Sequence, residues 1–298
     1  MIPTYNRVRF LPTTLQSVLG QDPGADRMQI EVVDNSSTGE VRDLVGRLGA
    51  SRVQLHSVAE RMSVTDAMNL CVERAAGQWV HILHDDDYVR PGFYERVAAA
   101  FVDRPDLGAV LCRFEFVDAN NQPFKLSALE QDQAGVLTGW LDRIAVSCRV
   151  QFPAIVVSRA AYSAVGAFDS RLEHSADWDM WRRIAVHFPV GYLPDVLASY
   201  RVHSRSDTTR LMRTGANVVD VRKSIHMSKA YLPQADWPRL RRQALRTCAR
   251  DAANNADQLL KEGDRAAAWA QIREGWKTDP SAWYLLKLLQ VMARQARR

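Results

Sequence analysis

The chain has 298 residues, of which 47% are hydrophobic and 24% are charged, a composition typical of globular proteins and not of disordered ones. It contains no apolar run near the ~18 residues that a membrane-spanning helix needs, and no charged-then-apolar secretory leader. The net charge is +5, and residues 236–298 carry 13 Lys and Arg against 7 Asp and Glu. We interpret this basic segment as a helical surface exposed to solvent. The alternative is a surface that binds an anionic membrane or an acidic partner.

The four cysteines are scattered and form no C-x-x-C pair. They are Cys71, Cys112, Cys148 and Cys248. This spacing predicts reduced thiols in a cytoplasmic protein, and it excludes a disulfide framework or a zinc site of the common kind.

The first third of the chain alternates strand-like and helical patterns. Strands are predicted at 28–34, 53–57, 79–84 and 109–116, and helices at 11–19, 39–48, 63–76 and 92–102. Strands that alternate with helices indicate an α/β fold with a doubly wound, mostly parallel sheet. The chain opens Met1-Ile2-Pro3, although a buried strand usually needs about five residues. We therefore expect a short first strand, and upstream native residues, if they exist, would raise the melting temperature.

Acidic residues follow two of these predicted strands. Asp34 ends the second strand, and Asp85, Asp86 and Asp87 follow the run WVHILH. Ligands of such sheets bind at the carboxyl ends of the strands. We therefore expect the acidic residues at these two strand ends to belong to one site. Unit charges ~4 Å apart repel by about 4 kcal/mol at an effective dielectric constant of about 20, so three adjacent carboxylates need an offsetting interaction.

A divalent cation is the offsetting partner that the residue types favour. Mg²⁺ and Mn²⁺ prefer oxygen ligands and are often held by one or two carboxylates together with substrate phosphates. Side chains at i and i+2 of an extended segment share a face, so Asp85 and Asp87 would face one ion. The competing interpretation is a solvated acidic turn before the helix that follows Pro91.

After residue 118 the predicted secondary structure changes twice along the chain. Residues 120–150 have weak periodicity and predict loop and helix, 154–158, 190–193 and 197–202 predict strands, and 177–187 predict a helix with an apolar stripe. From about Gly215 the sequence is helical, and segments 265–276 and 281–292 form a predicted hairpin. We therefore expect a domain over 1–214, with halves 1–118 and 119–214, and a helical extension over 215–298.

Five segments, in order, resemble family 2 of the inverting glycosyltransferases, which has the GT-A fold, a Rossmann-like sheet flanked by helices. They are IPTYNR with LPTTLQSVLGQ, IEVVDNSST, AMNLCVERAAGQWVHILHDDDYVRPGFYERV, VGAFDSRLEHSADWDMWRRIA and LASYRVHSRSDTT. The resemblance extends from Ile2 to about Thr209. It implies a single displacement in which a nucleotide sugar transfers its sugar, with inversion, to a hydroxyl acceptor.

The resemblance also implies roles for individual residues in donor and metal binding. Thr4, Asp34 and Asn35 would hold the nucleotide, although many relatives have a second acidic residue at the position of Asn35. Asp85 and Asp87 form the D-x-D motif, in which Asp87 would be the direct metal ligand and Asp85 would contact the ribose or metal-bound water. Asp86 and, with less support, Arg61 are further nucleotide-sugar candidates.

Asp177 matches the catalytic base of the family. Ala176 precedes it where relatives often have Glu, which removes a neighbouring charge but not the base. Spacing alone does not separate Asp177 from Asp179, and the purely structural alternative for Asp177 is a helix cap. The resemblance makes His203 a candidate metal or diphosphate contact, with a structural histidine as an equal alternative. Arg201 and Arg205 have the charge to neutralise phosphate oxygens.

These observations predict an inverting, nucleotide-sugar-dependent glycosyltransferase with Mn²⁺ or Mg²⁺ as cofactor. Its acceptor would be a glycan, a lipid-linked molecule or a small molecule in polysaccharide, glycolipid or other glycoconjugate biosynthesis. The alternative is a catalytically degenerate nucleotide-sugar-binding or scaffold protein. A nucleotidyltransferase is weaker, since PTYNRVRFLP lacks the glycines of a triphosphate loop. We expect a cytoplasmic location, with the basic C-terminal helices contacting the inner membrane face or another subunit, and no nucleic acid.

Overall fold

The structure is a computed structural model that describes residues 1–35 and 39–296. It divides into two compact units, one formed by residues 1–140, 149–170 and 187–202 and the other by residues 141–148, 171–186 and 203–298. These units interleave along the chain, whereas the predicted domains were continuous segments. The predicted boundary at residue 214 stays a prediction.

The first unit contains two sheets. The smaller has the order β1-β2-β3, and the larger has the order β4-β9-β6-β10-β5, with β7 on β6 and β8 on β10. The strands are β1 (Ile2–Thr4), β2 (Glu31–Asp34), β3 (Gln54–Ser57), β4 (Trp79–Val80), β5 (Tyr88–Val89), β6 (Ala109–Val117), β7 (Pro123–Leu126), β8 (Gly135–Val136), β9 (Ile155–Ser158) and β10 (Val190–Arg201).

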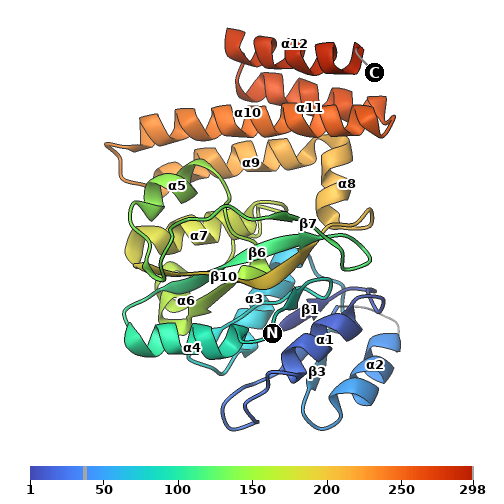
Figure 1. Cartoon of the computed structure of the whole chain (residues 1–298), viewed down its shortest axis with the longest axis vertical. Coiled ribbons are helices and arrows are strands. Elements are labelled where there is room, and N and C mark those ends of the chain that lie inside the picture. Colours follow the sequence, from blue (N-terminus) through green and yellow to red (C-terminus); the bar gives the residue numbers. More distant parts are fainter. Residues whose placement is uncertain (36–38, 297–298) are drawn as a thin grey trace. The chain divides into compact units, whose positions relative to one another are not determined.

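Helices cover these sheets at several points (Figure 1). In the first unit α3 packs on β1, α2 on β3, α1 on β5, α4 on β6 and β10, and α6 on β9. The helices are α1 (Leu11–Leu19), α2 (Glu40–Gly49), α3 (Val64–Arg74), α4 (Phe93–Asp103) and α6 (Arg159–Val165), with a 3-10 turn at Phe152–Ala154. The core consists of apolar side chains from both sheets, such as Val32, Leu111 and Val156.

The expected mostly parallel sheet is wrong for the larger sheet. Its β6 and β10 are parallel, but β4, β5, β7, β8 and β9 all pair antiparallel to their neighbours. Part of the reason is a hairpin between β6 and β7 that was expected to be loop. The Asp118 carboxylate accepts the N–H groups of Asn120 and Gln122 there, and Asn121 has φ 64°, so the chain reverses without a crossover helix.

The predicted strand 79–84 is regular only at its start. Beyond β4, the N–H of Leu83 donates to the carbonyl of Met1 at 2.9 Å, and the amino group of Met1 donates to the carbonyl of His81 at 2.8 Å. The segment after β4 therefore lies beside β1. It brings Asp85 to the end of β1, where its carboxylate accepts a hydrogen bond from the Thr4 hydroxyl.

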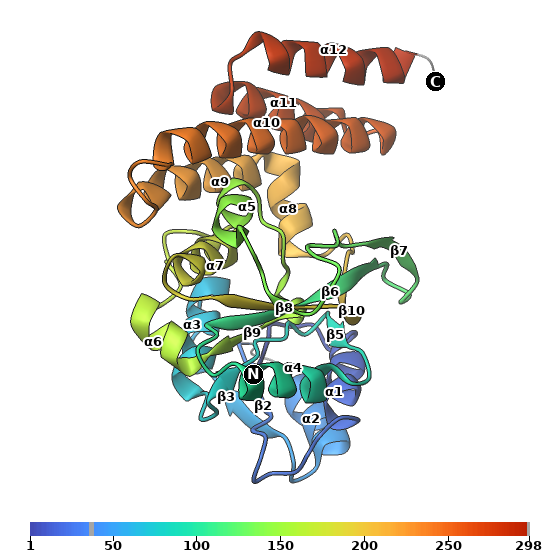
Figure 2. The ribbon, with the colours of Figure 1, turned by 60° about the vertical axis from the view of Figure 1, so that its left-hand side comes forward.

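The second unit is helical. Its helices are α5 (Trp140–Val146), α7 (Ala176–His187), α8 (Asp207–Thr214), α9 (Ala216–Met227), α10 (Trp237–Lys261), α11 (Arg265–Thr278) and α12 (Ala282–Ala296), with a 3-10 turn at Ser228–Ala230. Helix α10 packs against α9, α11 and α12 (Figures 1 and 2). Small residues on α10 and α11, including Ala256 and Ala268, form one of its apolar clusters with Leu259. In the described part of the chain, no helix has the length and apolarity to cross a membrane.

Candidate active site

The carboxyl ends of the three parallel strands lie at one edge of the small sheet. The register pairs Thr4 with Asp34 and Asp34 with Ser57. Because the last residues of the three strands are in register, their side chains lie at the same edge of the sheet. Thr4 and Asp34 are therefore neighbours at this edge, and their expected contact with a nucleotide stays a prediction.

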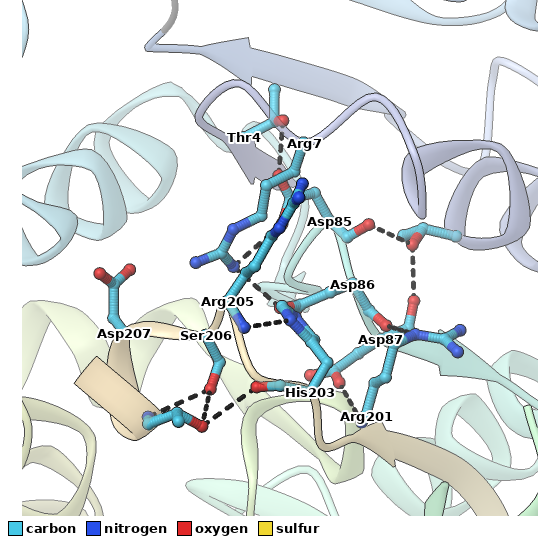
Figure 3. Close-up of polar contacts among 12 residues, drawn as sticks. Thr4, Arg7, Asp85, Asp86, Asp87, Arg201, His203, Arg205, Ser206 and Asp207 are labelled. Atoms are coloured by element: carbon cyan, nitrogen blue, oxygen red, sulfur yellow. Dashed lines mark hydrogen bonds and ion pairs between the residues drawn. The ribbon is translucent and has the colours of Figure 1, made fainter. Parts of the chain in front are cut away.

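Thr4 also reaches the first aspartate of the triplet. Its Oγ1 donates to Asp85 Oδ2 at 2.6 Å, and both side chains are buried (Figure 3). The hydroxyl of Thr14 on α1 lies 2.9 Å from the carbonyl oxygen of Asp85 and 2.6 Å from that of Asp87. Thr14 thus holds the backbone of the turn, a role that the sequence did not reveal because Thr14 lies in an ordinary helical pattern.

Arg7 is the cation beside the triplet. Its Nη1 lies 2.8 Å from Asp86 Oδ2 and 3.5 Å from Asp85 Oδ1 (Figure 3). Sequence reasoning missed Arg7, although it belongs to the IPTYNR segment. Asn6 precedes it with φ 53°, in the left-handed region that Asn adopts more readily than most residues. The chain therefore turns sharply between β1 and the arginine.

Asp87 is anchored differently from its two neighbours. Its Oδ1 accepts the main-chain N–H of Arg201 at 2.8 Å, while the Arg201 Nε donates to the carbonyl of Asp86 at 2.6 Å. The Arg201 guanidinium is buried over the ring of Phe10, 4.6 Å from the centroid, and also donates to the carbonyl of Asp118. Arg201 therefore stabilises the aspartate turn through hydrogen bonds, and its guanidinium is not exposed to bind a phosphate.

Burial changes the acidity of the triplet. Desolvation, followed by the charge of Asp86, raises the pKa of Asp85 to about 7 and raises the pKa of Asp87 well above its ordinary value. The charge of Arg7 and the Arg201 main-chain N–H oppose these shifts. An added cation would stabilise the ionised carboxylates in this position.

The donor set fits a divalent cation that also takes ligands from its substrate. The oxygens of Asp85, Asp86 and Asp87 are hard ligands of the kind that Mg²⁺ and Mn²⁺ prefer. Within the described ranges, however, no three His, Cys, Asp or Glu side chains converge on one point. A divalent cation held by these carboxylates would take its other ligands from phosphate or water oxygens.

Asn35 is hydrogen bonded to the loop that carries Arg61. The Asn35 amide donates to the carbonyl of Met62 at 2.9 Å and accepts the N–H of Met62 at 3.0 Å. Arg61, the residue before Met62, stacks over the ring of Tyr5, 4.6 Å from the centroid. Asn35 therefore fixes the loop that carries Arg61, and an acidic residue would lack the donor for this paired contact.

Asp177 lies in the first turn of α7 in the second unit. It is half-buried, and its Oδ1 accepts the N–H of Trp178 at 2.6 Å. Burial, opposed by that N–H and reinforced by the charge of Asp220, raises the pKa of Asp177 to about 7. Asp179 instead pairs with Arg183 at 2.9 Å and accepts a hydrogen bond from Tyr231 at 2.8 Å. Asp179 is thus held by an ion pair and a tyrosine hydroxyl, whereas Asp177 accepts a main-chain N–H of its own helix. The assignment of Asp177 as base stays a prediction.

His203 stands in the loop before α8. Its Nδ1 accepts the main-chain N–H of Arg205 at 3.2 Å, and its carbonyl accepts the hydroxyl of Thr209 at 3.0 Å (Figure 3). An accepting Nδ1 places the proton of the neutral ring on Nε2. The expected role of His203 toward a metal or a diphosphate stays a prediction.

Aromatic side chains near Asp177 and near the aspartate triplet pack in the interior. The indole N–H of Trp178 donates to the carbonyl of Ile144 at 2.6 Å, and Trp181 is buried. His84, beside the triplet, stacks on Phe152 with ring centroids 4.5 Å apart. All four cysteines are free thiols, as the sequence predicted.

Comparisons with known proteins identify relatives of this chain. A curated relative from Mycobacterium tuberculosis, described as uncharacterised, is 25% identical over 239 residues, covering 74% of this chain and 71% of its own length. A "PGL/p-HBAD biosynthesis glycosyltransferase" of Mycobacterium bovis is 26% identical over 205 residues, covering 67% of this chain and 75% of its own.

Solved structures show a similar fold at low sequence identity. Staphylococcus aureus TarS 1-349 in complex with UDP-GlcNAc has a TM-score of 0.58 at 14% identity, covering 93% of this chain and 90% of TarS 1-349. The mannosyltransferase PcManGT from Pyrobaculum calidifontis, in complex with GDP-Man and Mn²⁺, has a TM-score of 0.60 at 19% identity, covering 99% of this chain and 85% of PcManGT.

The family model described as "Glycosyl transferase family 2" matches residues 1–156. That match includes Thr4, Asp34 and the three aspartates, and it spans more than half of the 298 residues. The protein therefore belongs to glycosyl transferase family 2, an inverting family, and is a nucleotide-sugar-dependent glycosyltransferase.

Proposed function

We propose that this protein uses a divalent cation to transfer a sugar from a nucleotide-sugar donor to a hydroxyl group, in the synthesis of a glycolipid or another glycoconjugate. The observation that carries the proposal is the buried Asp85–Asp87 turn, with Arg7 and Thr4 against it at the carboxyl ends of β1 and β2. The PGL/p-HBAD biosynthesis glycosyltransferase supports a glycoconjugate product, and PcManGT in complex with GDP-Man and Mn²⁺ supports the cation.

The aspartate turn would hold the cation and the diphosphate end of the donor. Asp86 is the least enclosed of the three, with 7% of its surface exposed against 2% for Asp85 and 1% for Asp87. We therefore assign Asp86 to the cation together with Asp85, and we give Asp87 a supporting role through Arg201. When bound, the cation supplies Lewis-acid stabilisation of the negative charge on the leaving diphosphate.

The nucleoside would lie along the edge formed by Thr4, Asp34 and Asn35. Asn35 acts through the loop that it fixes, and the Arg61 guanidinium brings positive charge to this side of the unit. His203 would donate its Nε2–H to a phosphate oxygen instead of ligating the cation. This role agrees with the hydrogen bond that its Nδ1 accepts.

Asp177 would act as the general base. It takes the proton from the acceptor hydroxyl while the oxygen of that hydroxyl forms a bond to the anomeric carbon. The bond from this carbon to the diphosphate oxygen breaks, its electron pair stays with the nucleoside diphosphate, and the configuration inverts. A carboxyl whose pKa is about 7 has the basicity that this step needs near neutral pH.

The test is titration calorimetry with UDP-GlcNAc, GDP-mannose and a dTDP-sugar, each with and without Mn²⁺. We expect Mn²⁺-dependent binding of one nucleotide class. The same donor should bind unchanged to Asp177→Asn, while release of nucleoside diphosphate falls by about 100-fold or more. Full turnover by Asp177→Asn would contradict its role as base, and equal donor binding without Mn²⁺ would contradict the cation.

We also propose that α12 contacts an anionic membrane surface. The exposed side of this helix carries Leu285, Leu286, Leu289 and Met292, each 48–64% exposed. The sequence from Ala282 to Arg298 contains four Lys or Arg and no acidic residue. Apolar side chains beside unopposed positive charge match the interface of an anionic bilayer, whereas a second copy of this helix would bring like charges together.

A further inference from the structure

The loop that leads into α7 is tied to α9 through one carboxylate. Asp220 Oδ2 accepts the N–H of Glu173 at 2.9 Å, and Oδ1 accepts the N–H groups of His174 at 3.2 Å and Ser175 at 2.9 Å. The Ser175 hydroxyl donates to Oδ1 as well, at 2.5 Å. Four donors from three consecutive residues thus converge on a side chain that lies 45 residues away from Ser175.

These bonds fix the start of the helix that carries the proposed base. Ser175 is 2% exposed, and its carbonyl accepts the N–H of Asp179, which closes the first turn of α7. Asp177 lies within this turn. A change in the position of Ser175 therefore changes the position of the Asp177 backbone directly.

A second contact from the same face of α9 holds the next turn of α7. Arg182 of α7 donates to the side-chain and main-chain oxygens of Ser224, one helical turn after Asp220. The Arg182 guanidinium also stacks over the ring of Trp178, 4.1 Å from its centroid. Residues at i and i+4 share a helix face, so α9 presents Asp220 to the start of α7 and Ser224 to its middle.

We infer that Asp220 is a positioning residue for the proposed base Asp177, because its carboxylate holds the loop 173–175 at the start of α7. This inference rests on the proposed function. Asp220 lies beyond the segments that resemble the family.

The charges around Asp177 have opposing effects. Asp220 on α9 disfavours the ionised form of Asp177, while Arg182 on α7 favours it. In the loop before α7, Glu173 pairs with Arg210 at 2.5 Å. Burial lowers the pKa of His174 in the same loop, which keeps that ring neutral near pH 7. Removing the charge of Asp220 should therefore make Asp177 a weaker base that ionises at lower pH.

The experiment is the pH dependence of kcat/KM for nucleoside diphosphate release from UDP-GlcNAc or GDP-mannose with Mn²⁺, using water as acceptor. The wild-type rate should fall about tenfold per pH unit below pH 7, since the base must be ionised. In Asp220→Asn the midpoint of this acid limb should move down by about 0.5 pH unit or more. Its kcat should fall about tenfold, with little change in the KM of the donor.

Two control variants separate the charge from the contacts. Ser175→Ala removes one hydrogen bond but keeps the charge of Asp220, so its midpoint should stay at the wild-type value. Asp220→Glu keeps the charge in a displaced position and should restore the midpoint more fully than kcat. Because a midpoint does not depend on the amount of folded enzyme, partial unfolding of a variant leaves this readout valid.

An unchanged midpoint and kcat in Asp220→Asn would overturn the inference and leave Asp220 a structural anchor. Wild-type turnover by Asp177→Asn would overturn the proposed base itself, and this inference with it. The two failures are distinguishable, because the first occurs with an inactive Asp177→Asn variant and the second with an active one.

Discussion

At the residue scale, the three adjacent aspartates have three different environments. Asp85 accepts from Thr4, Asp86 pairs with Arg7, and Asp87 accepts from the main chain of Arg201. The side-chain alternation expected along an extended segment does not apply, because the N–H of Asp87 donates to the carbonyl of His84 at 3.1 Å and forms a turn. A turn changes the direction of each successive side chain, so the spacing of the motif did not reveal these roles.

Matched alanine variants of Asp86 and Asp87 should fail in different ways. Asp87→Ala leaves the buried N–H of Arg201 without its acceptor, and we expect the free energy of unfolding to fall by about 1–3 kcal/mol. Asp86→Ala should change it by less than about 1 kcal/mol, yet weaken Mn²⁺-dependent donor binding by about tenfold or more. Thermal unfolding and calorimetry measure the two effects. An Asp87→Ala variant of wild-type stability that has lost Mn²⁺-dependent binding would restore Asp87 as the direct ligand.

At the element scale, helices followed the sequence pattern closely and strands did so less well. The helix predicted at 11–19 is α1 to the residue, and the helix predicted at 177–187 is α7 with one residue added. In contrast, the strands predicted at 190–193 and 197–202 are one strand, β10, whose register shifts between Leu193 and Val196. Pro194 lies at this irregularity and has no N–H to donate to the neighbouring strand. The local sequence pattern therefore resembled the end of one strand and the start of another.

A pair of glycine substitutions tests helix packing in the second unit. A Cβ at Gly275 of α11 would collide with the phenol of the buried Tyr284 of α12, with Cζ at 2.7 Å, and would lie 3.1 Å from Ala252 Cβ on α10. We expect Gly275→Ala to destabilise the protein by about 1–2 kcal/mol, because overpacking outweighs the gain in helix propensity.

Gly46 in α2 provides the matched control. A Cβ there meets nothing within 4 Å, so Gly46→Ala should stabilise the protein by about 0.5–1 kcal/mol. Urea denaturation measures both variants. Equal effects of the two substitutions would show that the contact between α11 and Tyr284 is looser than the structure indicates.

At the scale of the whole molecule, the charge asymmetry of the sequence leads to a test of membrane binding. The full chain should co-sediment with vesicles that contain 30% anionic lipid and not with neutral vesicles, and salt should weaken the binding. Leu286→Gln combined with Leu289→Gln should reduce the bound fraction several-fold, since it removes two exposed apolar side chains. Val102→Gln, which replaces a 69% exposed valine on α4, is the matched control.

The competing occupant of the α12 surface is a second copy of the chain. Light scattering distinguishes the two, because a dimer that the same double substitution dissociates would overturn the membrane proposal. Equal binding of the double variant and the Val102→Gln control would overturn it as well.

The sequence by itself determined the order of most elements, the family, and the set of donor-site candidates, because helical periodicity, strand ends and short motifs depend on residues close together in the chain. Only the tertiary structure decided the mixed direction of the larger sheet, the placement of Arg7 and the different contacts of the three aspartates. The hydrogen bond between Asp87 and Arg201 spans 114 residues, and that between Ser175 and Asp220 spans 45. Such contacts result from packing between distant segments, for which no local pattern exists.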